Sequence, residues 1–365
     1  RWLPLSRGLG DVYKRQQEEG GFGWVAFNYL KKIIGPRASP DVPLSPYAVI
    51  EMGGASAQVS QMAPTPEDGA KIPAQYKFSF SIEGKDYVLY THSYLGYGAE
   101  QARERYNALV KDKDEMCYNV GYPFEAAKRR LQAAAAPAAA ITPPAAVTPP
   151  AATAPTAPAA PAAPLIKRIF SLCMKNIPHL FTSLLSAAAL SPAAPPSPPP
   201  NLRANPAPQH CATPGPHTFG CVHQPTFVTQ APRILAFENF FYVASALGVQ
   251  GEGPVSHGNS SSRATVFPLV TTPQKFLEAS EKFCNSEWKE VSVHYPLDNQ
   301  EKDVNKKACF LGAYSYGFLV EGLHIPSTKP ITIQKEVAGS EIEWALGAAY
   351  KEAAGFLKRT NLRPT

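Results

Sequence analysis

The stretch from 131 to 166 contains no charged residue, and this feature limits most strongly how the chain can fold. Between 133 and 164 only Ala, Pro, Thr, Ile and Val occur. Repeated prolines remove the backbone N–H groups that helix interiors and central strands use, so the tract predicts a disordered or polyproline segment. A second proline-rich block covers about 191–208, while 165–190 has the pattern of a short amphipathic helix. The chain is therefore predicted to carry a low-complexity insertion at 131–209 within an otherwise ordered fold.

The net charge of +6 is spread along the chain and does not favour nucleic-acid binding, because no dense Lys/Arg block alternates with aromatic residues. The six cysteines form no C-x-x-C pair, so a zinc site is not indicated. Their even number fits either reduced core thiols or disulfides in an oxidising compartment, and the sequon Asn259-Ser260-Ser261 favours the secretory route. Residues 1–16 lack the apolar run of a signal peptide and include DVYKRQ, which resembles a translated sequencing adapter. We interpret them as a non-native leader.

Strand-like and helix-like segments alternate outside the insertion, which predicts an α/β fold. Strict alternation at 75–82 and 86–92 predicts a β-hairpin. Two short apolar runs, 47–52 and 56–62, are separated by glycines and predict a strand, a turn and a second strand. A helix is expected from about 23 to 34, entered through a glycine turn. Further helices are expected at 97–112, 274–288, 308–322 and 341–357, a segment entering a helix at 233–250, and a strand at 330–337.

The segment VIEMGGASAQVS (49–60) combines the end of a strand with a turn that has almost no side chains. Glycines after a strand let backbone N–H groups approach an anion closely. Ser56 and Gln58 can bind a water molecule or a phosphate oxygen, and Glu51 can hold a hydrated cation. The pattern indicates a turn that binds phosphate and metal. The alternative is a tight β-turn with an exposed acid.

The segment EEGGFGW (18–24) places two acids before glycines and a bulky aromatic residue. A carboxylate on a glycine hinge can be aimed at a water molecule, while Trp24 anchors the helix that follows. The alternative is an acidic first turn of a helix, which is stabilising by itself.

In this order and spacing, the two segments resemble regions of the GDA1/CD39 nucleoside phosphatase family of apyrases, nucleoside triphosphate diphosphohydrolases and Golgi nucleoside diphosphatases. The resemblance implies an actin-like, ribonuclease-H-like lobe, a mixed sheet flanked by helices, formed by 17–130 and 210–338. It implies that 339–365 is a closing helix of a further, N-terminal lobe, so the chain is interpreted as N-terminally truncated and nearly inactive alone. Further similar segments are YVLYTHSYLGYGAEQARERY (87–106), EMCYNVGY (115–122), FENFFYVASALGV (237–249), FCNSEW (283–288), ACFLGAYSYGFLVEG (308–322) and EIEWALGAAY (341–350).

The resemblance also implies catalytic roles. Glu19 is expected to be the catalytic base, and Ser56 and Gln58 are expected to hold the water that it activates. Glu51 stands where the family usually has aspartate, and it is expected to hold Mg²⁺ or Ca²⁺ through water. The expected phosphate-binding residues are Gly53, Gly54, Ala55 and Ser56.

The family resemblance assigns base binding to an aromatic run. Phe240, Phe241 and Tyr242 are candidates for stacking on the base, and core packing is the alternative for each ring. Trp344 is expected to pack internally, and His92 in its strand is expected to be structural.

The cysteines fit the same resemblance. Cys284 and Cys309 match a disulfide that joins two helices, and Cys117 is expected to pair with Cys211 or Cys221. Cys173 lies in the insertion and has no counterpart. Disulfides imply the Golgi lumen or the cell exterior, with membrane anchoring outside this stretch left open.

The implied reaction is in-line attack of water on the terminal phosphate of a nucleoside tri- or diphosphate, assisted by Mg²⁺ or Ca²⁺. Nucleotides are the expected partners. A non-catalytic lumenal nucleotide-binding protein and an exopolyphosphatase-like enzyme are the alternatives. Phosphate number, base preference and oligomeric state are left open by the sequence.

Overall fold

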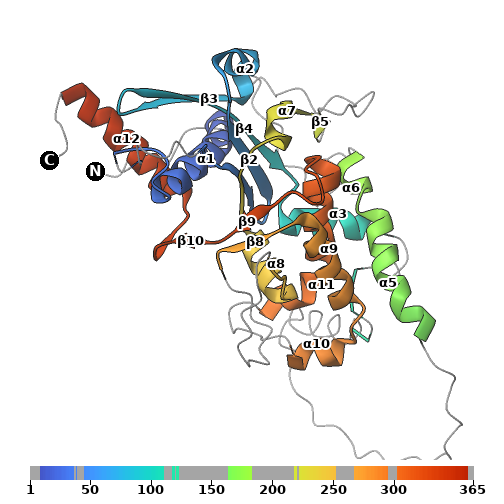
Figure 1. Ribbon diagram of the computed structural model, residues 1–365. Coiled ribbons are helices and arrows are strands. Elements are labelled where there is room, and N and C mark those ends of the chain that lie inside the picture. The colour runs from blue at the N-terminus through green and yellow to red at the C-terminus, as the bar shows by residue number, and fades with distance from the viewer. Residues whose placement is uncertain are drawn as a thin grey trace, which may run out of the picture.

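The computed structural model describes residues 9–36, 38, 45–110, 117–119, 121–122, 163–182, 218–219, 222–251, 267–294 and 302–360. These residues form a seven-stranded sheet of order β3-β4-β2-β1-β7-β9-β8, with helices on both faces (Figure 1). The strands are β1 (Ala48–Met52), β2 (Ser56–Met62), β3 (Lys77–Ile82), β4 (Lys85–Leu95), β7 (Ile234–Glu238), β8 (Leu269–Thr271) and β9 (Ile331–Ile333). Two small hairpins join β5 (Thr218–Phe219) to β6 (Val222–His223) and β10 (Glu336–Val337) to β11 (Ser340–Glu341).

The directions of the strands determine which strand ends lie together at one edge of the sheet. β7 is parallel to both β1 and β9, whereas β2 is antiparallel to β1 and to β4. This arrangement of a β-hairpin unit beside parallel strands confirms the predicted mixed α/β, ribonuclease-H-like class. Because β1 and β7 are parallel, their carboxyl ends meet at one edge, which is where such sheets bind ligands. The two predicted strand–turn–strand units, β1–β2 and β3–β4, are present at nearly the expected bounds.

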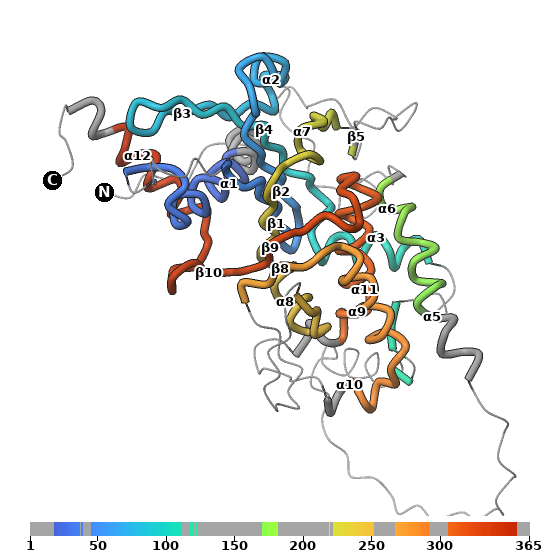
Figure 2. The backbone as a smooth tube through the Cα atoms, in the orientation of Figure 1, coloured from blue at the N-terminus to red at the C-terminus, as the bar shows by residue number. Residues whose placement is uncertain are grey.

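One face of the sheet is covered by α1 (Leu9–Leu30) and α12 (Trp344–Thr360). Figure 2 shows these first and last helices of the chain lying side by side, and Tyr29 of α1 stacks on Tyr350 of α12 with ring centroids 3.9 Å apart. The predicted helix start near residue 23 is wrong, because α1 continues without a break from Leu9 through the glycines. Buried side chains in this layer include Trp24, Phe27, Val49, Phe78, Phe80, Leu89, Leu235 and Phe237.

The other face is covered by a thicker layer of helices (Figure 1). Its core contains side chains of β1, β7 and β9 that point away from α1, such as Ile50, Ala236 and Ile333. The helices of this layer are α3 (Ala99–Leu109), α8 (Asn239–Leu247), α9 (Pro273–Cys284) and α11 (Lys302–Gly317), which continues as a π-helical segment at Phe318–Gly322. Shorter elements are α2 (Pro66–Lys71), a 3₁₀ turn at Ala74–Tyr76, α7 (Thr226–Thr229) and α10 (Trp288–His294).

Part of the predicted insertion belongs to this layer. Helices α5 (Ala163–Asn176) and α6 (His179–Thr182) bury an apolar stripe against α3, α9 and α11. The remaining residues of the predicted insertion, 131–162 and 183–209, lie outside the described part of the chain. The stripe consists of Phe170, Cys173, Ile177 and Leu180, spaced as on one helical face.

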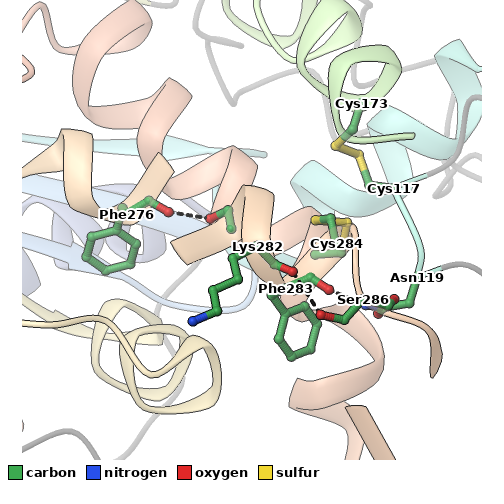
Figure 3. The surroundings of a disulfide bond; sticks show 10 residues. Cys117, Asn119, Cys173, Phe276, Lys282, Phe283, Cys284 and Ser286 are labelled. Atoms are coloured by element: carbon green, nitrogen blue, oxygen red, sulfur yellow. Dashed lines mark hydrogen bonds between the residues drawn. A yellow bond between two sulfur atoms is a disulfide. The ribbon is translucent and has the colours of Figure 1, made fainter. Parts of the chain in front are cut away.

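This packing changes the disulfide pattern. Cys117 is bonded to Cys173, not to Cys211 or Cys221 as predicted (Figure 3). The prediction is wrong because α5 folds onto the helical layer and carries Cys173 to the turn at 117–119. Cys284 and Cys309 form the expected second disulfide, which joins α9 to α11. None of the helices described here is both long and apolar enough to cross a membrane.

Candidate active site

Helix α1 crosses the sheet so closely that two of its positions have no room for a side chain. A Cβ atom at Gly20 would lie 2.9 Å from Ser60 Oγ and 3.0 Å from Thr91 Oγ1. A Cβ at Gly21 would lie 2.7 Å from the Phe78 ring. Glycine permits this contact of backbone with sheet, and the contact explains why glycines occur inside a helix that they weaken locally.

Glu19 directly precedes this contact and lies close enough to β1 for its charge to raise the pKa of Glu51. Glu19 and Gly23 are four residues apart and so lie on the same face of α1. A Cβ at Gly23 would be 3.6 Å from Glu51 Oε2, and one at Gly20 would be 3.1 Å from Gln58 Cβ. Burial raises the pKa of the half-buried Glu19 carboxyl. The structure thus brings Glu19, Glu51 and Gln58 to one place, although α1 holds Glu19 in a continuous helix rather than on a hinge.

Gln58 organises the polar side chains next to Glu51. The two residues are direct partners in the β1–β2 ladder, so their side chains share a face of the sheet. Gln58 Nε2 donates to Ser56 Oγ at 2.8 Å and to Ser93 Oγ at 3.2 Å. Gln58 Oε1 and Glu51 Oε2 are buried without a hydrogen-bond partner among the described residues. Buried polar atoms are normally paired, so these oxygens indicate a site for water, cation or substrate.

Three carboxyl groups influence one another here. The pKa of Glu51 is raised to about 8, first by burial and then by the charges of Glu238 and Glu19. Burial, followed by the charges of Glu341 and Glu343, also raises the pKa of Glu238, and Lys335 opposes this shift. The edge of the sheet is therefore short of positive charge, which favours the protonated form of Glu51 when no cation is close.

The glycine turn, residues 53–55 between β1 and β2, directs two of its backbone N–H groups outward. Ala99 N and Glu100 N at the start of α3 each donate at 2.9 Å, to Gly53 O and Gly54 O respectively. In a trans peptide the C=O and the next N–H point in opposite directions. The N–H groups of Gly54 and Ala55 therefore point away from α3, and both residues are exposed. Adjacent outward N–H groups form a site for an anion.

Gly98 supports the turn from behind. A Cβ at Gly98 would lie 2.5 Å from Gly54 C and 2.5 Å from Ser56 N. Gly96 N donates to Ala55 O at 2.9 Å, so the segment before α3 wraps the turn with backbone hydrogen bonds. The turn is held by its neighbour rather than by its own side chains.

The junction of β7 and α8 is strained. Glu238 has φ 59° and ψ −121°, a left-handed conformation that favours glycine. Asn239 Nδ2 donates to Met52 O at 2.7 Å, which ties this junction to the strand end just before the glycine turn. Such conformations cost about 1–3 kcal/mol and occur often at functional sites.

The aromatic run after this junction does not behave as one group. Phe240 is completely buried, with its ring centroid 6.5 Å from that of Phe276, so for this ring the structure shows core packing, the alternative to base stacking. It is the first apolar residue of α8 to face the helical core. Phe241 and Tyr242 are half-buried, and Lys335 Nζ lies 5.3 Å above the Phe241 ring. These two rings stay candidates for base binding.

The two expected structural residues differ in outcome. His92 is buried between Tyr76 and Tyr94, and burial lowers its pKa to about 4, so it is a neutral core histidine as expected. Trp344 is 47% exposed at the start of α12, so internal packing of this ring is not observed.

The oxygen donors fit a divalent cation of the Mg²⁺ or Ca²⁺ type. Both ions prefer carboxylate, carbonyl and water oxygens, and Glu51 Oε2 is a buried carboxylate oxygen without a partner. The described residues contain no cluster of three or more His, Cys, Asp or Glu side chains suited to a metal. Glu51 would therefore hold such an ion together with waters and a phosphate oxygen.

Some residues of the site carry no local signal in the sequence. Ser93 lies one residue beyond the predicted strand 86–92, and its contact with Gln58 arises from strand pairing. Gly98 lies in the predicted helix 97–112, and its contact with the glycine turn arises from close packing of backbone on backbone. Glu238 and Asn239 lie in the predicted aromatic segment 233–250. Two polar residues between apolar ones were the feature of the sequence that could have indicated a role in the site.

The fold and the site define an α/β protein that presents a carboxylate beside an anion-binding turn at the ends of parallel strands. The chain belongs to the GDA1/CD39 (nucleoside phosphatase) family, whose model matches residues 15–132 and 203–364.

Individual relatives are distant. The chain is 27% identical to ectonucleoside triphosphate diphosphohydrolase 8 of Gallus gallus and 23% identical to guanosine-diphosphatase of Saccharomyces cerevisiae, in each case over 95% of this chain and 58% of the relative. It is 32% identical to apyrase 1 of Arabidopsis thaliana over 34% of this chain and 26% of that protein. The crystal structure of nucleoside triphosphate hydrolases from Neospora caninum aligns with a TM-score of 0.47 at 12% identity, covering 93% of this chain and 64% of that chain. The chain thus spans a little over half the length of the first two relatives.

Proposed function

We propose that the protein hydrolyses the terminal phosphate of nucleoside tri- or diphosphates, with water as the nucleophile. The observation that carries this proposal is the closeness of Glu19 to Glu51, whose pKa its charge raises, with Gln58 beside Glu51 and the outward amides of Gly54 and Ala55 at the same strand end. Family membership as a nucleoside phosphatase supports it.

In the proposed reaction the turn holds the terminal phosphate through backbone N–H groups. Ser56 and Gln58, which are bonded to each other at 2.8 Å, orient the attacking water. Glu19 accepts a proton from this water, the water oxygen forms a bond to the terminal phosphorus, and the bond from that phosphorus to the bridging oxygen breaks. Inorganic phosphate forms, and the nucleoside di- or monophosphate leaves with the bridging oxygen. Positioning and charge stabilisation contribute most of the rate in such reactions.

Mg²⁺ or Ca²⁺ is the proposed cofactor, held by Glu51 through water. The ion would neutralise charge on the phosphate oxygens. Its presence would also favour the ionised form of Glu51, whose pKa is raised by burial and by two neighbouring acids. We propose Phe241 and Tyr242 as the base-binding rings, and we expect this stretch of chain alone to turn over little nucleotide.

The proposed location is the secretory lumen or the cell exterior. Two disulfides among the described residues support it, since such bonds persist in oxidising compartments.

Replacing the catalytic base tests the proposal. Glu19→Gln in the full protein should lower kcat by roughly two orders of magnitude or more, because the amide cannot accept the proton. Nucleotide affinity should change little. Phosphate release from ATP and GDP with Mg²⁺ or Ca²⁺ measures the rate, and Glu18→Gln is the matched control on the same helix. A Glu19→Gln enzyme with unchanged kcat would contradict the assignment.

A second candidate function is nucleotide binding without hydrolysis. The observation that favours it is Glu51 itself, which stands where the family usually has aspartate and whose longer side chain changes the geometry of the metal site. Metal-dependent nucleotide binding by a wild-type protein that releases no phosphate would favour this candidate. Release of phosphate from long polyphosphate that nucleosides do not inhibit would instead indicate an exopolyphosphatase-like enzyme.

A further inference from the structure

Arg105 of α3 is a buried cation with an unusual set of partners. Its Nη1 donates to Gly96 O at 3.0 Å and its Nη2 to Leu180 O at 2.7 Å. The guanidinium carbon lies 4.6 Å from the centre of the Tyr97 ring. No carboxylate in the described part of the chain forms a salt bridge with it. Buried charges are costly unless they are paired, so this arrangement calls for an explanation.

One of its two carbonyl partners leads directly to the glycine turn. Gly96, whose carbonyl accepts from Arg105, donates its own N–H to Ala55 O at 2.9 Å. Tyr97, under the guanidinium, is held by Tyr314 Oη, which donates to Tyr97 O at 2.7 Å. Arg105 therefore restrains the backbone segment that wraps the turn, on the side opposite to the outward amides.

The other partner belongs to the segment predicted as insertion. Leu180 lies in α6, and its side chain is fully buried. Helices α5 and α6 are tied to the body of the protein by the Cys117–Cys173 disulfide, which Figure 3 shows between α5 and the 117–119 turn. Asn119, two residues along, donates to Phe283 O of α9 at 2.6 Å. The carbonyl that receives Arg105 is thus fixed to two parts of the helical layer.

We propose that Arg105 is a positioning residue for the phosphate-binding turn, and that α5 and α6 are part of this device. The α6 carbonyl fixes the guanidinium, the guanidinium fixes the Gly96 carbonyl, and the N–H of the same residue holds the Ala55 carbonyl. The guanidinium acts on the turn through this backbone link and does not itself touch the anion that the outward amides would bind. The inference rests on the proposed function only in naming phosphate as that anion.

The test compares variants of the full protein by inorganic phosphate binding, KM and kcat for nucleotide, and amide hydrogen exchange. Arg105→Gln should weaken phosphate binding and raise KM about tenfold or more, since a charged buried donor is lost. Exchange should become faster at 53–56 and 96–101. Arg105→Lys, whose single amine cannot reach both carbonyls, should fall between wild type and Arg105→Gln, and it replaces that variant if Arg105→Gln does not fold.

Removing the disulfide tests the role of α5 and α6. A Cys117→Ala/Cys173→Ala variant should change the same measurements in the same direction. Combined with Arg105→Gln it should add little, because both changes act through one connection. Additive effects would overturn the link to α6.

Arg233→Gln is the matched control. Arg233 also contacts a carbonyl, Ser45 O, and a ring, Tyr47, but at the opposite end of β1 and β7. It should lower stability without changing phosphate affinity. If Arg105→Gln behaves like this control, with unchanged exchange at 53–56, Arg105 is merely structural and the proposal is overturned. If the wild type binds no phosphate, the proposed function fails, and the exchange measurement still decides the positioning role.

Discussion

Glu51 is the residue whose charge depends most on what occupies the site. Its carboxyl is largely buried between α1 and the sheet, and its pKa is raised to about 8 by burial, then by Glu238 and Glu19. The unfolded chain has the ordinary value of 4.5. Between these two values the folded protein keeps a proton that the unfolded chain releases, so folding becomes less favourable as pH rises.

The free energy of unfolding of the metal-free protein should therefore fall across this window, by up to about 1.4 kcal/mol per pH unit from Glu51 alone. Glu51→Gln should flatten the fall, because the amide does not titrate. Mg²⁺ or Ca²⁺ should stabilise wild type most at the alkaline end of the window and should have little effect on Glu51→Gln. Urea unfolding at several pH values measures this.

Glu67→Gln, at an exposed position in the first turn of α2, is the control for loss of one negative charge. It should keep the pH slope of the wild type. An equal slope for wild type and Glu51→Gln would show that Glu51 titrates normally.

Gly54 in the glycine turn and Gly98, which packs against that turn, are glycines for different reasons. Gly98 has φ −70°, which any residue can adopt, so its restriction comes from contact with the turn and not from backbone conformation. Gly54 has space for a Cβ, with Glu100 Cγ at 3.8 Å, but it carries an outward amide.

Two substitutions distinguish these two reasons. Gly98→Ala should displace the turn and lower stability by about 1–3 kcal/mol together with phosphate affinity. Gly54→Ala should leave stability nearly unchanged and still weaken phosphate binding, because a methyl group obstructs approach to the amides. Thermal melting and phosphate titration check both. Full phosphate affinity in Gly98→Ala would contradict the supporting role.

Helix α1 shows how packing overrides helix propensity. Alanine is favoured over glycine in a helix interior by about 1 kcal/mol. At Gly20, however, the new methyl group would lie 2.9–3.1 Å from three groups of β2 and β4, whereas at Gly23 the nearest atoms are 3.6 Å away or more.

Gly20→Ala should consequently lower stability and reduce kcat about tenfold or more, because α1 must move outward and carry Glu19 with it. Gly23→Ala should raise stability, following propensity. Denaturant unfolding measures the stability of both variants, and a kcat measurement on Gly20→Ala tests whether Glu19 has moved. Stabilisation by both alanines would show that α1 does not press on the sheet at Gly20.

For the whole molecule, the two disulfides have different consequences although both hold the helical layer. Cys117 and Cys173 are 56 residues apart, and Cys284 and Cys309 are 25 apart. Loop-closure entropy alone assigns about 4 kcal/mol to the first and about 3.5 kcal/mol to the second.

Alanine variants of each pair should therefore lose similar stability in urea. Phosphate affinity should fall in the Cys117/Cys173 variant and stay unchanged in the Cys284/Cys309 variant, because the first pair holds α6 against Arg105. A loss of affinity in both variants would indicate general loosening of the fold.

Local chemistry in the sequence was sufficient for the β1–β2 and β3–β4 units, the glycine turn and the α/β class. Alternation, glycines and turn residues act over a few neighbours, and their effect does not depend on distant parts of the chain. The residues Glu51, Ser56 and Gln58 could be proposed from the sequence for the same reason, since they lie within one short segment.

The tertiary structure decided what depends on contacts between distant segments. Helix α1 continues through Gly20 and Gly21 because these glycines let it pack directly on the sheet. The same packing of distant segments buries Phe240 in the core. The tertiary structure also joined Cys173 to Cys117 and placed Gly98 and Arg105 behind the turn. Each of these outcomes is set by which surfaces meet in the folded chain, and a sequence pattern with a reach of a few residues does not contain that information.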